Sequence, residues 1–344
     1  MHFAKGFTAR GTLTVLLLGL HACGGSSEVA SQPATASAPS PSDAEAASAS
    51  VTPMPPGESG IAATNDAELA GARGKAEDFA GVTTVDALKK RLSAGSLQGV
   101  ARLDLAARGF GPALGQVLAG STAVTKLAAL DVSDNDLGAA GVRAITQSAN
   151  FQELRQLDLG GNAIGDAGVT ALTSSRGLSE LKVLNLSGNA IGPAGAKALA
   201  ASTWLDGVVS LDLSMNPIGA AGAKSLASSI HAGDVRSLFL LGCDIGPAGA
   251  SALSRSSSFP ALVVLALSGN AVGDAGAKAI ASSEAFAKVQ TLDLSANGIG
   301  DAGAKALAAS THLGSVRALE MFGNDFGASG STALKQRFGA ALKL

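Results

Sequence analysis

The chain has 344 residues, enough for two ordinary domains, and carries 25 basic and 27 acidic residues. No block of basic residues stands out, so the charge pattern gives no support to a nucleic-acid partner. The sequence holds 44 glycines, one tryptophan and no tyrosine. This composition excludes a core built on large aromatic side chains and favours elements that pack closely against copies of themselves.

Residues 1–22 are interpreted as a targeting segment, separate from the fold. A positively charged start is followed by an apolar stretch, Leu13 to Leu20, that is too short to span a bilayer. The segment ends before Cys23 and resembles the bacterial lipoprotein signal, which is cut before a cysteine that then carries lipid. The resemblance implies lipid attachment at Cys23. Because Gly24 and not aspartate follows, it also implies a place in the outer membrane or cell envelope. An ordinary secretory signal with an unrelated cysteine is the alternative.

The next segments change composition. Residues 23–60 consist mainly of serine, alanine, proline, threonine and glutamate, a mixture that buries too little apolar surface to fold, so we expect a disordered tether. Within residues 61–97, the run from Val85 to Leu92 reads as a short amphipathic helix. Because solenoids need capping units at their ends, we expect 61–97 to form an N-terminal helical cap and 335–344 a C-terminal cap.

Between residues 98 and 334 the sequence repeats every 27 residues in nine copies. One leucine recurs without a slip, a set called here the leucine row: Leu103, Leu130, Leu157, Leu184, Leu211, Leu238, Leu265, Leu292 and Leu319. Apolar residues stand three before and two after each of them, and a glycine stands eight after. The alternation around each leucine is the period of a strand, and the following segment has the spacing of a helix. We expect Gly195, Leu199 and Ser202 to form the inward stripe of one such helix.

Five residues after each leucine stands a small polar residue that we expect to turn the chain and to bond backbone groups left unpaired by the turn. The members of this expected structural ladder are Asn135, Asn162, Asn189, Asn216, Cys243, Asn270, Asn297 and Asn324. Arg108 is the misfit in the first copy. A cysteine can serve there as a small buried donor, so Cys243 needs neither a disulfide partner nor a reactive role.

The run LKVLNLSGNAIGPAGAKALA, residues 181–200, carries the pattern L-x-x-L-x-L-x-x-N/C-x-L. It resembles the leucine-rich-repeat family, closest to the ribonuclease-inhibitor-like class. The GAKALA, GAKSLA and GAKAIA runs are also similar to bacterial repeat proteins named for a Gly-Ala-Leu-Ala signature. The resemblance implies an α/β solenoid shaped as a horseshoe, with a parallel β-sheet on the concave face and α-helices on the convex face. Strand spacing of about 4.8 Å against helix spacing of about 8 to 10 Å requires the same curvature.

Motifs for chemistry are missing. The sequence has no nucleophile elbow, phosphate loop or dinucleotide fingerprint. Residues 293–304 imitate the start of a calcium loop, but Ala304 stands where the bidentate glutamate is needed. His231 and His312 share a repeat position three copies apart, too far for one metal ion. We therefore predict no enzyme activity, no cofactor and no metal site.

The residues free to act are outward-facing strand positions on the concave face. The residue after each row leucine is mostly acidic, which is either the habitual filler of this position or an acidic face for a basic partner or cation. An apolar break in the fifth and sixth repeats, with Met215 nearby, suggests a protein-binding hot spot or mere repeat drift. The expected partner-binding residues are Asp104, Asp131, Asp158, Asp212, Phe239, Leu241, Val264, Asp293, Glu320 and Phe322. Trp204 stands at an expected loop position and is predicted to be exposed.

The sequence favours a lipid-anchored, extracytoplasmic, monomeric module that binds a protein through its concave face and a membrane through its N-terminal lipid. One alternative is a secreted effector acting in a target cell, as the Gly-Ala-Leu-Ala resemblance implies. Those relatives carry an F-box, and residues 61–97 have no convincing equivalent. The other alternative is a regulator of a GTPase, since some related repeat proteins stimulate GTP hydrolysis, but no residue here marks such a role.

Overall fold

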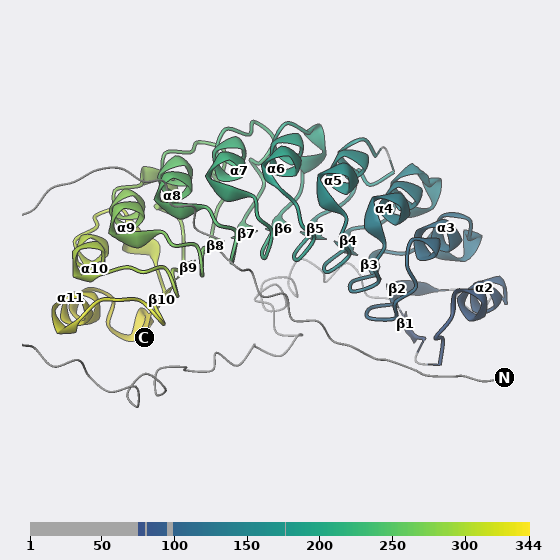
Figure 1. Cartoon of the computed structure of the whole chain (residues 1–344), viewed down its shortest axis with the longest axis horizontal. Coiled ribbons are helices and arrows are strands. Elements are labelled where there is room, and N and C mark those ends of the chain that lie inside the picture. Colours follow the sequence, from purple (N-terminus) through teal and green to yellow (C-terminus); the bar gives the residue numbers. More distant parts are fainter. Residues whose placement is uncertain (1–74, 80, 95–98, 176) are drawn as a thin grey trace, which may run out of the picture. The chain divides into compact units, whose positions relative to one another are not determined.

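The computed structural model describes residues 75–344 apart from residues 80, 95–98 and 176. All described residues fall within one compact unit. The expected signal, Cys23 and the tether lie outside them. In Figure 1 this unit is an arc, with strands on its inner side and helices on its outer side. None of the described helices has the length and apolar content needed to cross a bilayer.

Strands and helices alternate along the described residues. The strands are β1 (Lys75–Asp78), β2 (Val100–Asp104), β3 (Ala129–Asp131), β4 (Gln156–Asp158), β5 (Val183–Asn185), β6 (Ser210–Asp212), β7 (Ser237–Phe239), β8 (Val264–Ala266), β9 (Thr291–Asp293), β10 (Ala318–Glu320) and β11 (Leu342–Lys343). The α-helices are α2 (Val85–Ser93), α3 (Ala113–Ala119), α4 (Gly138–Gln147), α5 (Gly165–Thr173), α6 (Pro193–Ala200), α7 (Gly219–Leu226), α8 (Gly246–Ser254), α9 (Gly273–Ala281), α10 (Asp301–Ala308) and α11 (Ala328–Phe338). Short 3-10 helices are η2 (Thr122–Val124), η3 (Ala149–Phe151), η4 (Thr203–Leu205), η5 (Glu284–Phe286), η6 (Leu313–Ser315) and η7 (Gly339–Ala341).

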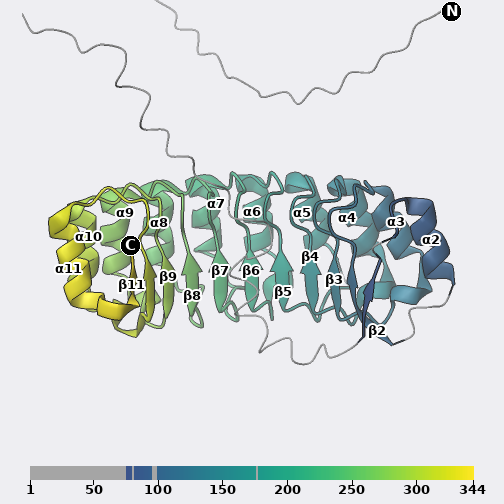
Figure 2. The same cartoon turned by 90° about the horizontal axis from the view of Figure 1, so that it is seen from below.

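The eleven strands form one sheet whose order follows the chain from β1 to β11. Neighbouring strands are parallel, and the leucine row is in register: Leu103 pairs with Leu130, and Leu130 with Leu157. The same pairing continues to Leu319 on β10. Figure 2 looks onto this concave wall and shows the strands side by side. The predicted fold class, a parallel sheet lining an arc of helices, is confirmed.

The core lies between the sheet and the helices. Every leucine of the row is at most 2% exposed, which confirms the predicted buried row. Each fully buried leucine contributes about 1.5 to 3 kcal/mol, and ordering a 27-residue repeat costs more than its few large side chains supply. A single repeat is therefore unstable alone, and stacking supplies the missing contacts.

Ser202 lies outside the helix, contrary to the sequence expectation. Helix α6 ends at Ala200, and Ser202 begins η4. Its hydroxyl oxygen accepts from the Trp204 backbone N–H at 3.1 Å. The helix is eight residues long, so its inward stripe ends at Leu199. The serine instead caps the turn that leads back to the next strand, a role that hydroxyl side chains often have.

Trp204 is buried, at 9% exposure, so the prediction of an exposed tryptophan is wrong. The hydrogen bond from its backbone N–H to Ser202 orders η4 in place of an open loop. The tryptophan side chain packs with the main core cluster. The sequence did not show this, because the other repeats place either a small residue or, in His231 and His312, a polar ring at the same position.

The two ends of the described unit carry strands as well as helices. The predicted helix over Val85 to Leu92 is confirmed as α2. β1, which pairs with β2 ahead of the first repeat, was not foreseen. At the other end, α11 runs past residue 334 to Phe338, and β11 pairs with β10. Beyond the nine repeats, the N-terminal end therefore adds one strand–helix pair, β1 and α2, and the C-terminal end adds the strand β11.

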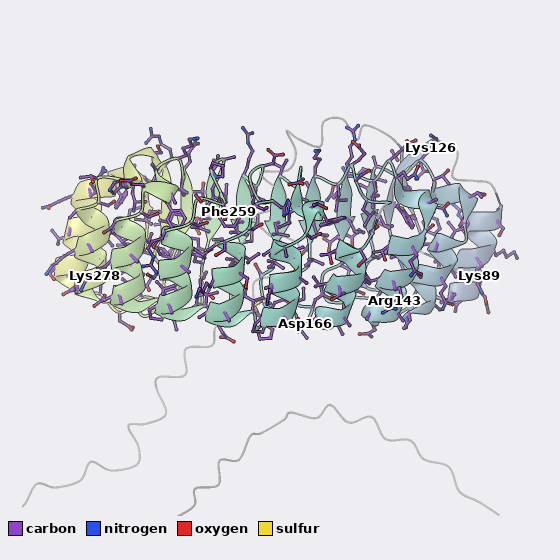
Figure 3. The ribbon with its side chains drawn as sticks, turned by 90° about the horizontal axis from the view of Figure 1, so that it is seen from above. Lys89, Lys126, Arg143, Asp166, Phe259 and Lys278 are labelled. Carbon is purple, nitrogen blue, oxygen red and sulfur yellow. The ribbon has the colours of Figure 1, made fainter. Side chains whose placement is uncertain are left out.

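Aspartates at the start of some helices bond to the following helix. The carboxylate oxygen Oδ1 of Asp274 in α9 accepts from the backbone N–H groups of Gly300 and Gly303, both at 2.8 Å, at the start of α10. Asp166 and Asp301 make the same pair of bonds to α6 and α11. Figure 3 shows Asp166 on the helical face. The first N–H groups of a helix have no partner within it, so these carboxylates staple neighbouring repeats together.

Replacing Asp274 with alanine is expected to lower the free energy of unfolding by about 1 kcal/mol, the usual cost of a lost N-terminal cap. Asp274→Asn keeps an acceptor oxygen and should cost less than the alanine variant. Urea unfolding followed by circular dichroism measures both. Equal losses for the two variants would contradict the staple, because only the alanine variant removes the acceptor.

Candidate functional site

The concave face is built from the residues on either side of each row leucine, because side chains alternate along a strand. The residue after each row leucine forms a line across the sheet, called here the acidic column: Asp104, Asp131, Asp158, Asn185, Asp212, Phe239, Ala266, Asp293 and Glu320. Strand register places consecutive members directly beside one another. The structure therefore brings the first three aspartates together on β2, β3 and β4. It places Asp293 and Glu320 at the other end, separated from them by the apolar break.

Each aspartate of the column is held by a short turn. The Oδ1 atom of Asp104 accepts from the Ala106 backbone N–H at 3.0 Å, and that of Asp131 accepts from the Ser133 N–H at 2.9 Å. Equivalent bonds hold Asp158, Asp212 and Asp293. The side chain thus closes an Asx turn at the strand end. This bond occupies one carboxylate oxygen and orients the other.

Burial makes the charged form of the column unfavourable. It raises the pKa of Asp158 to about 6, and the neighbouring carboxylate of Asp131 adds to the rise. Burial also raises the pKa of Asp131, Asp212 and Asp293, while hydrogen bonds from the turn serines oppose it. Like charges stacked on adjacent strands repel, and removal from water costs each ion more. The column is therefore held charged at a cost to stability.

The apolar break forms a second apolar cluster, separate from the main core. Its buried members are Val183, Phe239, Val264 and Ala266, with Leu241 and Val263 packed against them. Phe239 is 5% and Val264 9% exposed. These expected partner-binding residues are thus on the predicted face but buried. The large apolar side chains that do reach the surface there are Met215, 68% exposed, and Phe322, 47% exposed.

The asparagines beneath the concave rim form a continuous hydrogen-bonded ladder. Nδ2 of Asn189 donates to the carbonyl oxygens of Leu159, Leu186 and Ser187. Its Oδ1 accepts from the backbone N–H groups of Asn162 and Ile164. One side chain therefore satisfies five backbone groups across two repeats. The equivalent asparagines repeat most of these bonds, and all except the half-buried Asn324 are at most 1% exposed.

Cys243 occupies one rung of the ladder. Its thiol donates toward the carbonyl oxygen of Leu213, 3.2 Å away, and toward that of Leu241 at 3.5 Å. Burial raises the pKa of the Cys243 thiol to about 12. Because a thiolate is the reactive form, this cysteine has a structural environment and not a nucleophilic one.

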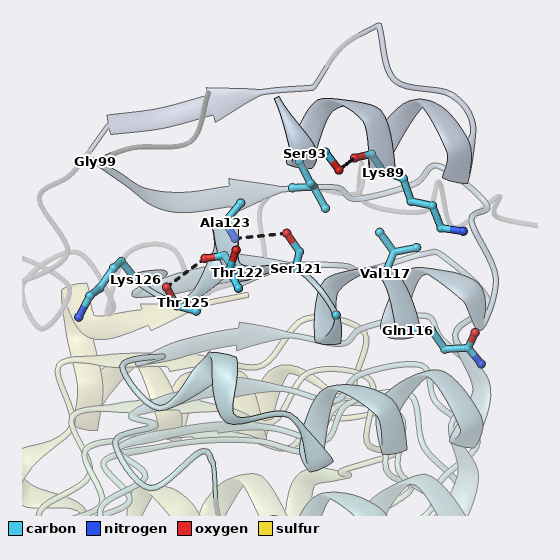
Figure 4. A pocket seen from close by; sticks show the side chains of 12 residues that line it. Lys89, Ser93, Gly99, Gln116, Val117, Ser121, Thr122, Ala123, Thr125 and Lys126 are labelled. Atoms are coloured by element: carbon cyan, nitrogen blue, oxygen red, sulfur yellow. Dashed lines mark hydrogen bonds between the residues drawn. The ribbon is translucent and has the colours of Figure 1, made fainter. Parts of the chain in front are cut away.

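Two hollows open near the N-terminal end of the described unit. One, of about 740 Å³, lies between α2 and α3 and is lined by Lys89, Gln116, Ser121 and Lys126 among others; Figure 4 shows it. The other, of about 460 Å³, lies on the concave sheet and is lined by Arg102, Asp104, Asp131 and Gln156. Sequence reasoning missed Arg102 and Gln156, because the residue before the row leucine follows no repeat pattern.

Nothing in the described part of the chain brings catalytic or metal-binding groups together. No three histidine, cysteine, aspartate or glutamate side chains there lie close enough to hold a metal ion. His231 pairs with Asp206 at 3.1 Å, and neither residue belongs to the acidic column. The arrangement on the concave face offers charge, hydrogen bonds and apolar contact to a ligand.

Comparison with known proteins agrees with the fold. The Leucine Rich repeat family model matches six segments, residues 125–145, 152–172, 179–200, 208–227, 261–281 and 287–308. No curated protein matches the sequence. Among solved structures, the chain is similar to one in the crystal structure of the mouse RP105/MD-1 complex, with 19% identity and a TM-score of 0.44. The match covers 70% of this chain but only 46% of that one. With its in-register parallel sheet, buried leucine row and six matched repeats, the described part of this protein is an α/β leucine-rich-repeat solenoid.

Proposed function

We propose that this protein is a lipid-anchored, extracytoplasmic interaction module that binds a protein partner on the concave face of its solenoid. The observation that carries the proposal is the contrast between buried and outward positions of the same strands. The leucine row repeats one residue nine times. The residue before it changes at almost every repeat: Arg102, Ala129, Gln156, Val183, Ser210, Ser237, Val264, Thr291 and Ala318. These positions together offer charged, polar and apolar side chains on one wall, the mixture that recognition of an irregular protein surface uses.

The shape and chemistry of the face support the same reading. Eleven strands give one continuous inner wall, and repeat solenoids use such concave walls for binding. The wall presents carboxylates at both ends and exposed Met215 beside its apolar cluster. Mixed apolar and charged contacts are typical of protein interfaces. The described residues hold no group of side chains that suggests a reaction instead.

Photo-crosslinking tests the binding face. A crosslinking amino acid is placed at Ser187 or Ser268 on the concave face, and at Lys197 or Lys278 on the convex helices of the same two repeats. We expect one and the same protein to be captured at both concave positions, and neither convex position to capture it. Figure 3 shows Lys278 on the convex side. Capture of that protein mainly at the lysine positions would contradict the proposed face.

The proposed anchor depends on Cys23, which lies outside the described residues. We expect labelled palmitate to be incorporated into the full chain and the protein to sediment with membranes. Cys23→Ser should abolish both, because a thiol is the attachment point in the lipoprotein signal that the sequence resembles. Cys243→Ser is the matched control and should leave both unchanged. Membrane association of the Cys23→Ser variant at the wild-type level would contradict lipid anchoring.

A further inference from the structure

The concave hollow over β2, β3 and β4 has a defined construction. Strand register places Arg102, Ala129 and Gln156 side by side in one line, with Asp104 and Asp131 in the next. Ala129 is the short member between two long side chains, and at 5% exposure it lies at the enclosed bottom of the space between them. The hollow of about 460 Å³ is lined by these five residues and by Leu103 and Leu130. Its floor is thus apolar and its walls carry polar groups.

Several acceptor atoms around this hollow have no donor. The Oε1 atom of Gln156 is shielded from solvent and accepts no hydrogen bond. Asp104 and Asp131 each use Oδ1 in the Asx turn, and within the described part of the chain no bond reaches either Oδ2. A shielded acceptor without a donor is costly, and most such groups in folded proteins are paired. The described residues therefore leave acceptors of this hollow without a donor.

Elsewhere in the column, carboxylates do receive donors from neighbouring side chains. Asp158, next in the column, uses both oxygens: Oδ1 accepts from the Gly160 N–H, and Oδ2 accepts from Nδ2 of Asn185 at 3.0 Å. At the far end of the sheet, Lys343 donates to Glu320 at 2.7 Å. Arg102 lines the hollow, yet among the described residues it forms no ion pair with either carboxylate. Among the described residues, none therefore donates to the Gln156 oxygen or to the Oδ2 atoms of the two carboxylates.

We propose that this hollow receives an arginine side chain of the protein partner, with its guanidinium donating to Asp104, Asp131 and Gln156. The proposal rests on the protein-binding function argued above and names the chemistry that the partner brings. A guanidinium is planar and carries five N–H donors, which suits three acceptors spread over two neighbouring columns. Its methylene stem can cover the Ala129 floor. A compact ammonium group serves several spread acceptors less well.

Charge complementarity favours this occupant over others. The hollow contains two carboxylates against one cation, Arg102, so a second cation brings the local charge to zero. An apolar side chain would leave the Gln156 oxygen and both carboxylates unpaired, which is unfavourable. An anionic group would meet two like charges. A metal ion is disfavoured, because no group of three or more carboxylate, histidine or cysteine ligands in the described part of the chain could hold one.

A peptide titration tests the proposal on the full-length protein. The probe is a short glycine peptide with one central arginine and blocked ends, and the control probe carries citrulline, which has the same shape without the charge. Nuclear magnetic resonance follows the amide signals of Ala106 and Ser133, whose N–H groups bond to the two carboxylates. We expect both signals to move with the arginine peptide and not with the citrulline peptide. Because the pair is charged and partly exposed, raising the salt concentration should weaken binding.

Variants distinguish binding of the arginine peptide in the hollow from binding to any carboxylate of the acidic column. Asp131→Asn should weaken arginine-peptide binding about tenfold, the loss expected for one charge-assisted bond. Gln156→Met, which keeps length but removes the acceptor, should weaken it severalfold. Asp293→Asn is the matched control, since it lies in the same column with the same Asx turn but outside the hollow. Equal loss with Asp293→Asn, or equal binding of the citrulline peptide, would overturn the proposal.

The outcome is distinguishable from failure of the proposed function. If photo-crosslinking captures a partner at Ser187 and Ser268 while the arginine peptide leaves Ala106 and Ser133 unmoved, the concave face binds protein by another chemistry. In that case the arginine proposal alone fails. If the peptide binds but crosslinking places the partner on the convex helices, the proposed face is wrong, and the hollow is a separate cation-binding site.

Discussion

Replacing Asp158 with asparagine is expected to raise the free energy of unfolding at neutral pH by about 1 to 3 kcal/mol. Burial raises the pKa of Asp158 from 3.8 to about 6. The native state must therefore hold a charged carboxylate in a poorly solvated place when the pH is above that value. Asparagine keeps the acceptor for the Gly160 N–H and removes the charge, at the cost of the bond that Oδ2 accepts from Asn185 Nδ2. The chain already shows that this works, because Asn185 makes the same turn one strand further on, accepting from the Ser187 N–H at 2.9 Å.

The contribution of Asp158 to the free energy of unfolding decreases as the pH rises. A carboxyl whose pKa is raised in the folded state stabilises the fold fully below the unfolded value, near 3.8, and this contribution is lost as the pH rises through about 6. The wild-type protein should therefore lose stability between about pH 4 and pH 7, to the extent that Asp158 contributes. In Asp158→Asn this part of the slope disappears. Urea unfolding across that range, with the denaturant slope checked for constancy, measures the effect.

Asp104→Asn is the matched control. Asp104 belongs to the same column and makes the same turn with Ala106, but its side chain is exposed. Removing its charge relieves no burial cost, so stability should change little. A destabilised Asp158→Asn variant, or one with the wild-type pH slope, would mean that the hydrogen bonds of the carboxylate outweigh its desolvation.

The acidic column is not the most stable choice at its position. A neutral amide fits the same turn, as Asn185 shows, and would avoid both burial and repulsion of charges on adjacent strands. Residues that lower stability without a structural need are commonly found at binding sites, where charge serves recognition. The stability experiment and the peptide titration therefore examine two sides of one question. The first measures what the carboxylates cost, and the second tests what they bind.

The fold could be predicted from the sequence because its determinants repeat. Each row leucine and each ladder asparagine occurs at the same place in copy after copy, so chance agreement is excluded and register follows from the period. Curvature follows from the different spacings of strands and helices. The residues that recur in each repeat are the same ones that stack on their counterparts in the solenoid. The periodic sequence signal and the buried architecture therefore have the same cause.

Features that occur once could not be predicted in this way. β1 lies outside the repeat and pairs with β2 through backbone groups that any sequence supplies. Trp204 is buried at the turn that Ser202 caps, although most of its counterparts in other repeats are small. The concave hollow depends on one short residue, Ala129, standing between Arg102 and Gln156. Such a site depends on residues that differ between neighbouring repeats. A search for positions that all repeats share does not detect it.

The solvent exposure of the side chains in the apolar break also could not be predicted from the sequence. Alternation correctly places Phe239 and Val264 on the concave side of their strands, and register sets them beside Ala266. Their low exposure depends on how these side chains pack with their neighbours, including Val183 two strands away. Period-two patterning fixes the face of a residue but not its accessible area. The role of Phe239, Leu241 and Val264 in partner binding therefore stays a prediction, and Met215 is the better exposed contact.

Removing one rung of the ladder is expected to destabilise the protein more than any surface change. Asn189→Ala should lower the free energy of unfolding by about 3 kcal/mol or more, because several buried backbone groups lose their only side-chain partner. Asn189→Cys should cost less. A thiol can donate one weak bond, as Cys243 does to Leu213, but it has no amide oxygen to accept from the Asn162 and Ile164 N–H groups.

The same chemistry predicts that Cys243→Asn stabilises the protein. In the regular repeats, Oδ1 of one asparagine accepts two N–H groups of the preceding repeat, as Asn216 does from Asn189 and Ile191, both at 2.9 Å. At the next rung Cys243 offers no such oxygen, and the Ile218 N–H bonds instead to the Asn216 carbonyl. Asparagine at 243 would restore these bonds and raise the free energy of unfolding by about 1 kcal/mol. Urea unfolding under reducing conditions measures the free energy of unfolding of each protein. We expect the highest value for Cys243→Asn, followed by the wild type, Asn189→Cys and Asn189→Ala. A less stable Cys243→Asn would show that the surrounding repeat has adapted its packing to sulfur, and that the ladder is not interchangeable rung by rung.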